Sequence, residues 1–80
     1  MQIKILLFGI VSDLVEASAL EMELNSGSTI ADFKVQLNQE HPQLKNYATY
    51  AIALNEEYAL DETLIQDQDV IAIIPPVSGG

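Results

Sequence analysis

The residues of this sequence best suited to chemistry are its last two, Gly79 and Gly80. Two terminal glycines form the narrowest end that a polypeptide can have, because neither carries a Cβ. Such an end can enter a tunnel and present its α-carboxylate to the active site of another protein. A carboxylate becomes an acyl donor once it is converted to an acyl-adenylate, and a sulfur nucleophile that displaces AMP leaves a thiocarboxylate. This chemistry requires no side chain from the carrier itself.

The side chains offer few alternatives, since the sequence has no cysteine and a single histidine, His41. Disulfides, zinc–thiolate sites and cysteine nucleophiles are therefore excluded, and a histidine-rich metal site or a Ser-His-Asp triad is disfavoured. The paired carboxylates Asp61-Glu62 and Asp67/Asp69 supply too few converging oxygens for a cation site, so we interpret them as solvated turns. We expect no metal site, and we interpret His41 as a surface residue.

The length and charge of the chain limit its organisation and its partners. Its 80 residues include 12 acidic and 3 basic side chains, with a net charge of −9. This size allows one small core, so we expect one domain over residues 1–74 and an extended tail over residues 75–80. The charge disfavours nucleic acids and anionic membranes and favours basic or apolar partners. No apolar run is long enough to span a membrane, and the N-terminus lacks signal-peptide features, so we expect a cytoplasmic protein.

Alternating and continuous apolar runs predict the strands that must carry this tail. Residues 2–8 and 70–74 are rich in β-formers and become apolar on both faces, whereas residues 19–24 alternate between apolar and acidic side chains. A third strand is expected over residues 47–54 and a very short one over residues 58–60. Leu64 and Ile65 are expected to fill the bottom of the core. The two most apolar strands, 2–8 and 70–74, should lie side by side in the middle of the sheet.

One main helix is expected between the second and third strands. Thr29 is a good N-cap, and Asp32 three residues later resembles a capping box. The apolar face of this helix is formed by Ile30, Phe33 and Leu37. Pro42 ends the helix, and residues 9–18 are expected to form the loop of a hairpin. The element order predicts an α+β class, in which one helix covers one face of a mixed sheet of four to five strands.

A sheet covered by one helix leaves apolar side chains on its other face. Four such residues belong to the two central strands, namely Leu6, Phe8, Ala72 and Ile74. A contiguous exposed apolar patch usually marks an interaction site, so we predict a protein interface here and add Tyr58 to it. The alternative is that the loop after Phe8, or the segment around Tyr58, folds over this face.

The chain resembles the small, sulfur-carrying subunits of molybdopterin synthase, which are ubiquitin-like β-grasp proteins. The resemblance is carried by residues 3–8, 29–33, 53–55 and 67–80. Its most specific part is the ending Pro-Pro-Val-Ser-Gly-Gly, since a terminal Gly-Gly alone also fits ubiquitin and the thiamine sulfur carriers. The chain departs from the family after the first strand. Ser12 and Asp13 stand where many relatives have an arginine, and Glu16 stands where many have a glycine.

The resemblance implies roles for the tail. Gly80 would be adenylated, with ATP and magnesium, by a ubiquitin-activating-like adenylyltransferase, and a sulfurtransferase would convert it to a thiocarboxylate. The large subunit of molybdopterin synthase would receive the tail residues Pro75, Pro76, Val77, Ser78 and Gly79 ahead of Gly80. There the sulfur would pass to a cyclic pterin phosphate, in molybdenum cofactor biosynthesis.

The resemblance also implies that the chain is not catalytic alone and holds no permanently bound cofactor. It would be the sulfur-donating subunit of a heteromeric transferase, and Phe8 and Ile74 match interface positions of the family. Two alternatives stay open. The activated tail could instead be joined to lysines, as in ubiquitin-like modifiers, or donate sulfur for thiamine synthesis. The chain could also be a β-grasp binding module with an inert tail.

Overall fold

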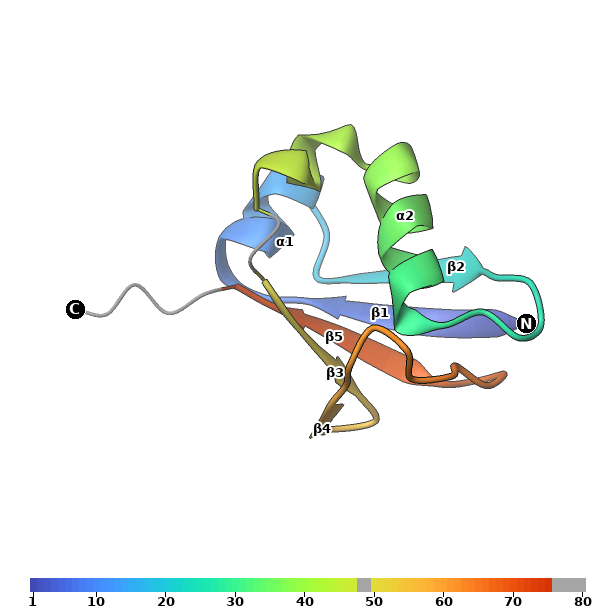
Figure 1. Ribbon diagram of the computed structural model, residues 1–80. Helices are drawn as coiled ribbons and strands as arrows, with labels where there is room; N and C mark the ends of the chain where they lie inside the picture. The colour runs from blue at the N-terminus through green and yellow to red at the C-terminus, as the bar shows by residue number, and fades with distance from the viewer. Residues whose placement is uncertain (48–49, 76–80) are drawn as a thin grey trace.

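The computed structural model describes residues 1–47 and 50–75, which form a five-stranded sheet with its helices on one side (Figure 1). In chain order the elements are β1 (Gln2–Leu7), α1 (Gly9–Val15), β2 (Ala19–Glu23), α2 (Ile30–Glu40), the 3-10 helix η1 (Pro42–Tyr47), β3 (Ala51–Leu54), β4 (Glu57–Tyr58) and β5 (Val70–Ile74). The strand order is β2-β1-β5-β3-β4, with β1 and β5 parallel and the other pairs antiparallel. The predicted mixed sheet and the pairing of its two most apolar strands are confirmed.

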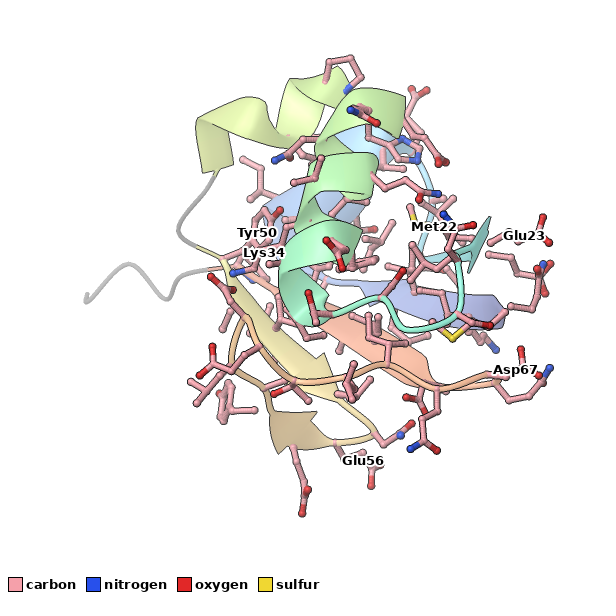
Figure 2. The ribbon with its side chains drawn as sticks, turned by 45° about the vertical axis from the view of Figure 1, so that its right-hand side comes forward. Met22, Glu23, Lys34, Tyr50, Glu56 and Asp67 are labelled. Carbon is pink, nitrogen blue, oxygen red and sulfur yellow. The ribbon has the colours of Figure 1, made fainter. Side chains whose placement is uncertain are left out.

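The core lies between the sheet and α2. In the parallel pair, Ile5 lies opposite Ile71 and Leu7 opposite Ile73, and all four side chains are buried. The core also receives the three residues predicted for the apolar face of the helix, Ile30, Phe33 and Leu37. On β2 the side chains alternate as expected, so that the Met22 side chain is buried and that of Glu23 is exposed (Figure 2). The period of two in the strands therefore decides which side chains are buried.

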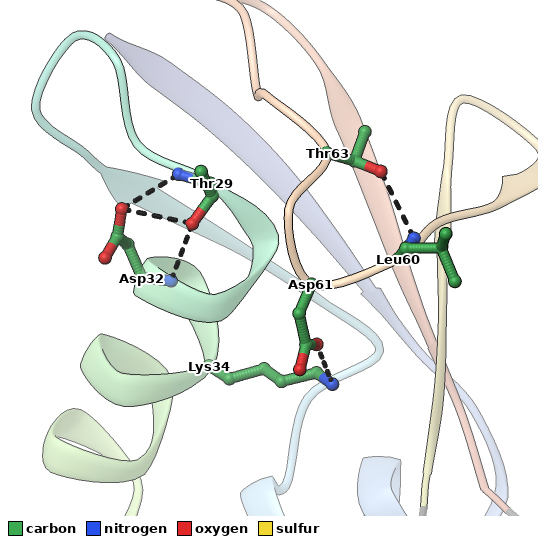
Figure 3. A network of polar contacts seen from close by, with 6 residues as sticks. All are labelled: Thr29, Asp32, Lys34, Leu60, Asp61 and Thr63. Atoms are coloured by element: carbon green, nitrogen blue, oxygen red, sulfur yellow. Dashed lines mark hydrogen bonds and ion pairs between the residues drawn. The ribbon is translucent and has the colours of Figure 1, made fainter.

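Helix α2 begins with the predicted capping box (Figure 3). The backbone N–H of Asp32 donates to Thr29 Oγ1 at 3.3 Å, and the Asp32 carboxylate accepts from the N–H of Thr29 at 3.0 Å. The N–H of Ile30 donates to the carbonyl oxygen of Thr63, at 3.0 Å, in the loop before β5. These contacts satisfy backbone donors that a helix start leaves unpaired. The helix ends before Pro42, as predicted.

The prediction of a loop after β1 is wrong, because residues 9–15 form the helix α1. Its Val11 is fully buried in the core that α2 covers, and Figure 1 shows both helices on the same side of the sheet. The segment after Phe8 therefore does not cover the opposite face. Val11, Leu14 and Val15 have helical spacing, but seven residues with an adjacent Ser-Asp pair give a weak local signal.

Helix α1 ends at a residue with a left-handed backbone conformation. Glu16 adopts a left-handed conformation with φ of 62°, and its N–H donates to the carbonyl oxygen of Ser12. This conformation after a helix is the one that glycine adopts most easily. Glu16 therefore occupies a conformation that its Cβ disfavours.

Three smaller predictions are corrected. Strand β1 ends at Leu7, and Phe8 is the N-cap of α1 rather than a strand residue. Strand β3 begins at Ala51, because Tyr47 belongs to η1, and residues 48–49 lie outside the described part. Leu64, expected to help fill the core, is 60% exposed. The Leu64 backbone forms an isolated β-bridge with Thr29 at the start of α2. The next side chain, that of Ile65, is the one buried in the core.

Candidate functional site

A groove with a volume of about 620 Å³ lies on the face of the sheet away from α1 and α2. It is lined by Leu6, Phe8, Ala53, Asn55, Glu56, Tyr58, Val70, Ala72 and Ile74. The strand residues among them alternate with the buried core residues of β1 and β5, which is why they face outward. The five residues predicted for the interface, Leu6, Phe8, Tyr58, Ala72 and Ile74, are all brought together here.

The groove is hollow because small side chains occupy its middle. Ala72 of β5 lies beside Leu6 of β1 on one side and beside Ala53 of β3 on the other. The two alanines form a low floor, and Ala53 in turn pairs with Tyr58 of β4. Phe8 is 49% exposed and Tyr58 is 80% exposed. Aromatic side chains left in water around an apolar hollow are typical of a binding site for another molecule.

The turn between β3 and β4 closes one end of the groove. Asn55 and Glu56 both have positive φ, 49° and 72°, as in the tight turns that join two antiparallel strands. Asn55 fastens this turn to β5, since its Oδ1 accepts from the N–H of Val70 at 3.0 Å and its Nδ2 donates to Asp69 Oδ1 at 2.9 Å. Glu56 projects at the turn (Figure 2). It adds a carboxylate to a lining that is otherwise mostly apolar.

Four lining residues escaped the sequence analysis, namely Ala53, Asn55, Glu56 and Val70. Alanine carries no signal for an interface, and a floor position is visible only once the order of the strands is known. The run Asn55-Glu56-Glu57 is recognisable as a turn, but nothing in the sequence shows that this turn lies beside the start of β5.

The tail starts beside the groove. Ile74, the last residue of β5, lines the groove, and Pro75 follows as the last described residue. Proline has no N–H, so it cannot continue the hydrogen-bonded ladder. The other predicted tail residues, Pro76, Val77, Ser78, Gly79 and Gly80, lie outside the described residues, and their roles stay predictions.

Three of the four carboxylates in the two acidic pairs have structural partners. Asp61 accepts from Lys34 Nζ at 2.7 Å and so joins the loop before β5 to α2 (Figure 3). Asp67 accepts from the N–H of Gln2 at 2.7 Å, and this hydrogen bond holds the pKa of Asp67 below its usual value. Asp69 binds the β3–β4 turn.

Within residues 1–47 and 50–75, no three His, Cys, Asp or Glu side chains gather as metal ligands. In the same part of the chain, no helix has the length and apolar character needed to cross a membrane.

Comparison of the sequence with known proteins finds relatives along the whole chain. Residues 5–80 match the ThiS family. The molybdopterin synthase sulfur carrier subunit of Arabidopsis thaliana is 39% identical over 80 residues, which cover 99% of this chain and 83% of the relative. The subunit of the same name from Chlamydomonas reinhardtii is 37% identical over 83 residues, with full coverage of both chains.

Comparison of the structure finds the same fold in solved proteins. SAMP1 from Haloferax volcanii superposes with a TM-score of 0.90 at 22% identity, over the full length of both chains. A chain in the complex of subunits 1 and 2 of the molybdopterin-converting factor from Helicobacter pylori 26695 superposes with a TM-score of 0.74 at 29% identity, again over both full lengths. The β-grasp, ubiquitin-like fold class is thereby confirmed.

Proposed function

The chain belongs to the ThiS family, and we propose that it is the sulfur carrier subunit of a molybdopterin synthase. The full-length relatives of this name, at 39% and 37% identity, support the proposal. The structural observation that carries it is the continuity of the apolar groove with the origin of the tail, since Ile74 lines the groove and the next residue begins the tail. A partner bound in the groove would thus hold the chain end close to its own active site.

The tail would be activated in two steps that balance without any redox change. In the first step, a carboxylate oxygen of Gly80 attacks the α-phosphorus of ATP, and pyrophosphate leaves. Magnesium would neutralise the phosphate charge during this step, on a separate adenylyltransferase. In the second step, sulfur at the oxidation level of hydrosulfide attacks the acyl carbon, and AMP leaves with the bonding electron pair. A sulfurtransferase would carry this sulfur as a persulfide, and a thiol would release it as hydrosulfide while forming a disulfide with the enzyme. The product of the second step is a thiocarboxylate on Gly80.

The tail, residues 75–80, would then carry its thiocarboxylate into the active site of the large subunit. There the thiocarboxylate sulfur would attack an oxygen-bearing carbon of a cyclic pterin phosphate, so that the C–S bond forms as the C–O bond breaks and the oxygen leaves with the bonding electron pair. Hydrolysis of the resulting thioester returns the carboxylate on Gly80 and leaves the sulfur on the pterin. The expected product is a dithiolene, the pair of sulfur atoms that holds molybdenum. Because it contains two sulfur atoms, two thiocarboxylate-bearing carriers each deliver one sulfur for every product molecule. In this scheme the carrier provides the acyl group, and all catalytic side chains belong to its partners.

The groove would be the surface on which the large subunit docks. Its exposed aromatic residues, Phe8 and Tyr58, are of the type that dominates binding energy at protein interfaces. Burying them would exclude water around the start of the tail. The net charge of −9 would also speed the encounter with a partner of positive potential.

Mass spectrometry of the protein purified from its host tests the proposal. We expect a fraction of the intact chain to be heavier by the mass difference between sulfur and oxygen, with the change located on Gly80. A variant lacking Gly80 should keep the fold and lose this species, and it should not support cofactor synthesis in cells. Isopeptide-linked products would instead favour a protein modifier, and a requirement in thiamine synthesis would favour a thiamine carrier. An unmodified tail, with full cofactor synthesis by the shortened chain, would show that the tail is inert.

A further inference from the structure

Gly9 and Pro75 lie in tight contact where the tail leaves the sheet. Gly9 is the first residue of α1 and has a left-handed backbone conformation, with φ of +56°. A Cβ built on Gly9 would come within 3.1 Å of Pro75 Cγ. Carbon atoms that are not bonded normally lie about 3.5–4.0 Å apart, so a side chain at Gly9 would force the Pro75 ring to move by a few tenths of an ångström.

The parallel pairing of β1 and β5 creates this contact. Leu7 lies opposite Ile73 in the register, and the two chains then continue in the same direction, one into α1 and the other into the tail. Two residues beyond that pair, the two chains meet as Gly9 and Pro75. Helix α1 begins at Gly9 and lies on the same side of the sheet as α2 (Figure 1), and no side chain of Gly9 separates its backbone from the Pro75 ring.

We propose that Gly9 is a positioning residue for the reactive chain end, because its bare backbone fixes where Pro75 sits and hence the direction in which the tail departs. This inference rests on the proposed function of the tail. Pro75 is the last described residue before the rest of the tail, so the orientation of Pro75 sets the direction in which that tail begins. If the tail starts in another direction, a smaller fraction of its conformations reaches the active site of the activating enzyme, which lowers the rate of adenylation.

The substitution Gly9→Ala tests this inference, and Gly27→Ala is its matched control. Gly27 also has positive φ, +85°, but a Cβ at Gly27 meets nothing within 4 Å. Both variants therefore carry the backbone strain of a left-handed alanine, and only Gly9→Ala pushes on Pro75. We expect kcat/KM for adenylation of the chain end by the activating enzyme to fall roughly tenfold in Gly9→Ala and to stay near the wild-type value in Gly27→Ala.

A rescue variant separates positioning from loss of stability. Replacing Pro75 by alanine removes Cγ, the atom that the new Cβ would meet. The double variant Gly9→Ala/Pro75→Ala should therefore recover most of the rate that Gly9→Ala loses, relative to Pro75→Ala alone. If Gly9→Ala folds poorly, Gly9→Asn and Gly27→Asn replace the pair, because asparagine tolerates positive φ while still carrying a Cβ.

Amide NMR spectra give a readout that does not depend on sulfur chemistry. The Val77 and Ser78 amide resonances should shift in Gly9→Ala and remain in place in Gly27→Ala. Unchanged resonances, an adenylation rate equal to that of Gly27→Ala, or no rescue by Pro75→Ala would overturn the inference. If the wild-type chain is not adenylated at all, the proposed function fails, whereas the NMR comparison still decides whether Gly9 directs the tail.

Discussion

Ala72 of β5 lies beside Leu6 of β1 in the parallel register, on the face of the sheet that neither helix covers. The side chain of Ala72 is too short to fill the space between its larger neighbours, and this shortfall forms the groove. The hollow therefore depends on Ala72 at the centre of β5 together with its neighbour Ala53 on β3. It can be filled without touching the hydrophobic core on the opposite face.

Filling the hollow should impair partner binding selectively. We expect Ala72→Leu to weaken binding of the large subunit by at least about tenfold, because the new side chain occupies space that the partner needs. The free energy of unfolding should change little, since the residue faces outward. Calorimetric titration with the large subunit and urea unfolding measure the two quantities. Ala19→Leu is the control, because Ala19 pairs with Leu6 on the same face without lining the groove, and equal loss of affinity in both variants would contradict the prediction.

Charge placed at the edge of the groove should separate binding from folding. Phe8→Asp removes an exposed aromatic side chain from the N-cap of α1, and aspartate is a favourable N-cap residue. We therefore expect stability to be kept or slightly raised, while affinity for the large subunit falls by more than about tenfold. Ile74→Asp should show the same loss of affinity with a small loss of stability. Parallel losses of affinity and stability would mean that these residues belong to the core.

The left-handed residue after α1 offers a stabilising substitution. We expect Glu16→Gly to raise the free energy of unfolding by about 0.5–1 kcal/mol, because glycine has no Cβ to resist a φ of 62°. Urea denaturation at neutral pH measures the change. Glu16→Gln removes the charge while keeping the Cβ, so it should give little of this gain. A gain of equal size in both variants would attribute the effect to charge instead.

Asp67 should make stability depend on pH in the acid range. Its pKa is lowered in the folded chain, mainly by the hydrogen bond from the N–H of Gln2, so the folded state favours the ionised carboxylate. This contribution is present above the unfolded-state pKa of Asp67, near 3.8, and is lost as the pH falls through the lower folded-state pKa. We expect the stability difference between the wild type and Asp67→Asn to be largest at neutral pH and to shrink below about pH 4. Urea unfolding at several pH values measures it, with the exposed Asp13→Asn as control, and a difference that does not vary with pH would contradict the prediction.

Features that depend on neighbouring residues could be predicted from the sequence. The capping box of Thr29 and Asp32, the apolar face of α2 and the run of β5 are each encoded within a few positions, and all three are confirmed. The sequence also predicts apolar side chains on the face of β1 and β5 that the helix does not cover, because a period of two assigns each side chain of a strand to one face. The Gly-Gly ending suggested the chemistry of the tail without any reference to the fold.

Other features were decided only by tertiary structure. Helix α1 was missed because its short segment has weak local preference and is stabilised by burying Val11 against distant parts of the chain. The floor of the groove requires Ala53 and Ala72 to be neighbours, and the base of the tail requires Gly9 to meet Pro75. Each of these contacts follows from the order and register in which distant strands pair. Local periodicity determines the face that a side chain takes, whereas the packing of the whole chain determines which side chains share that face.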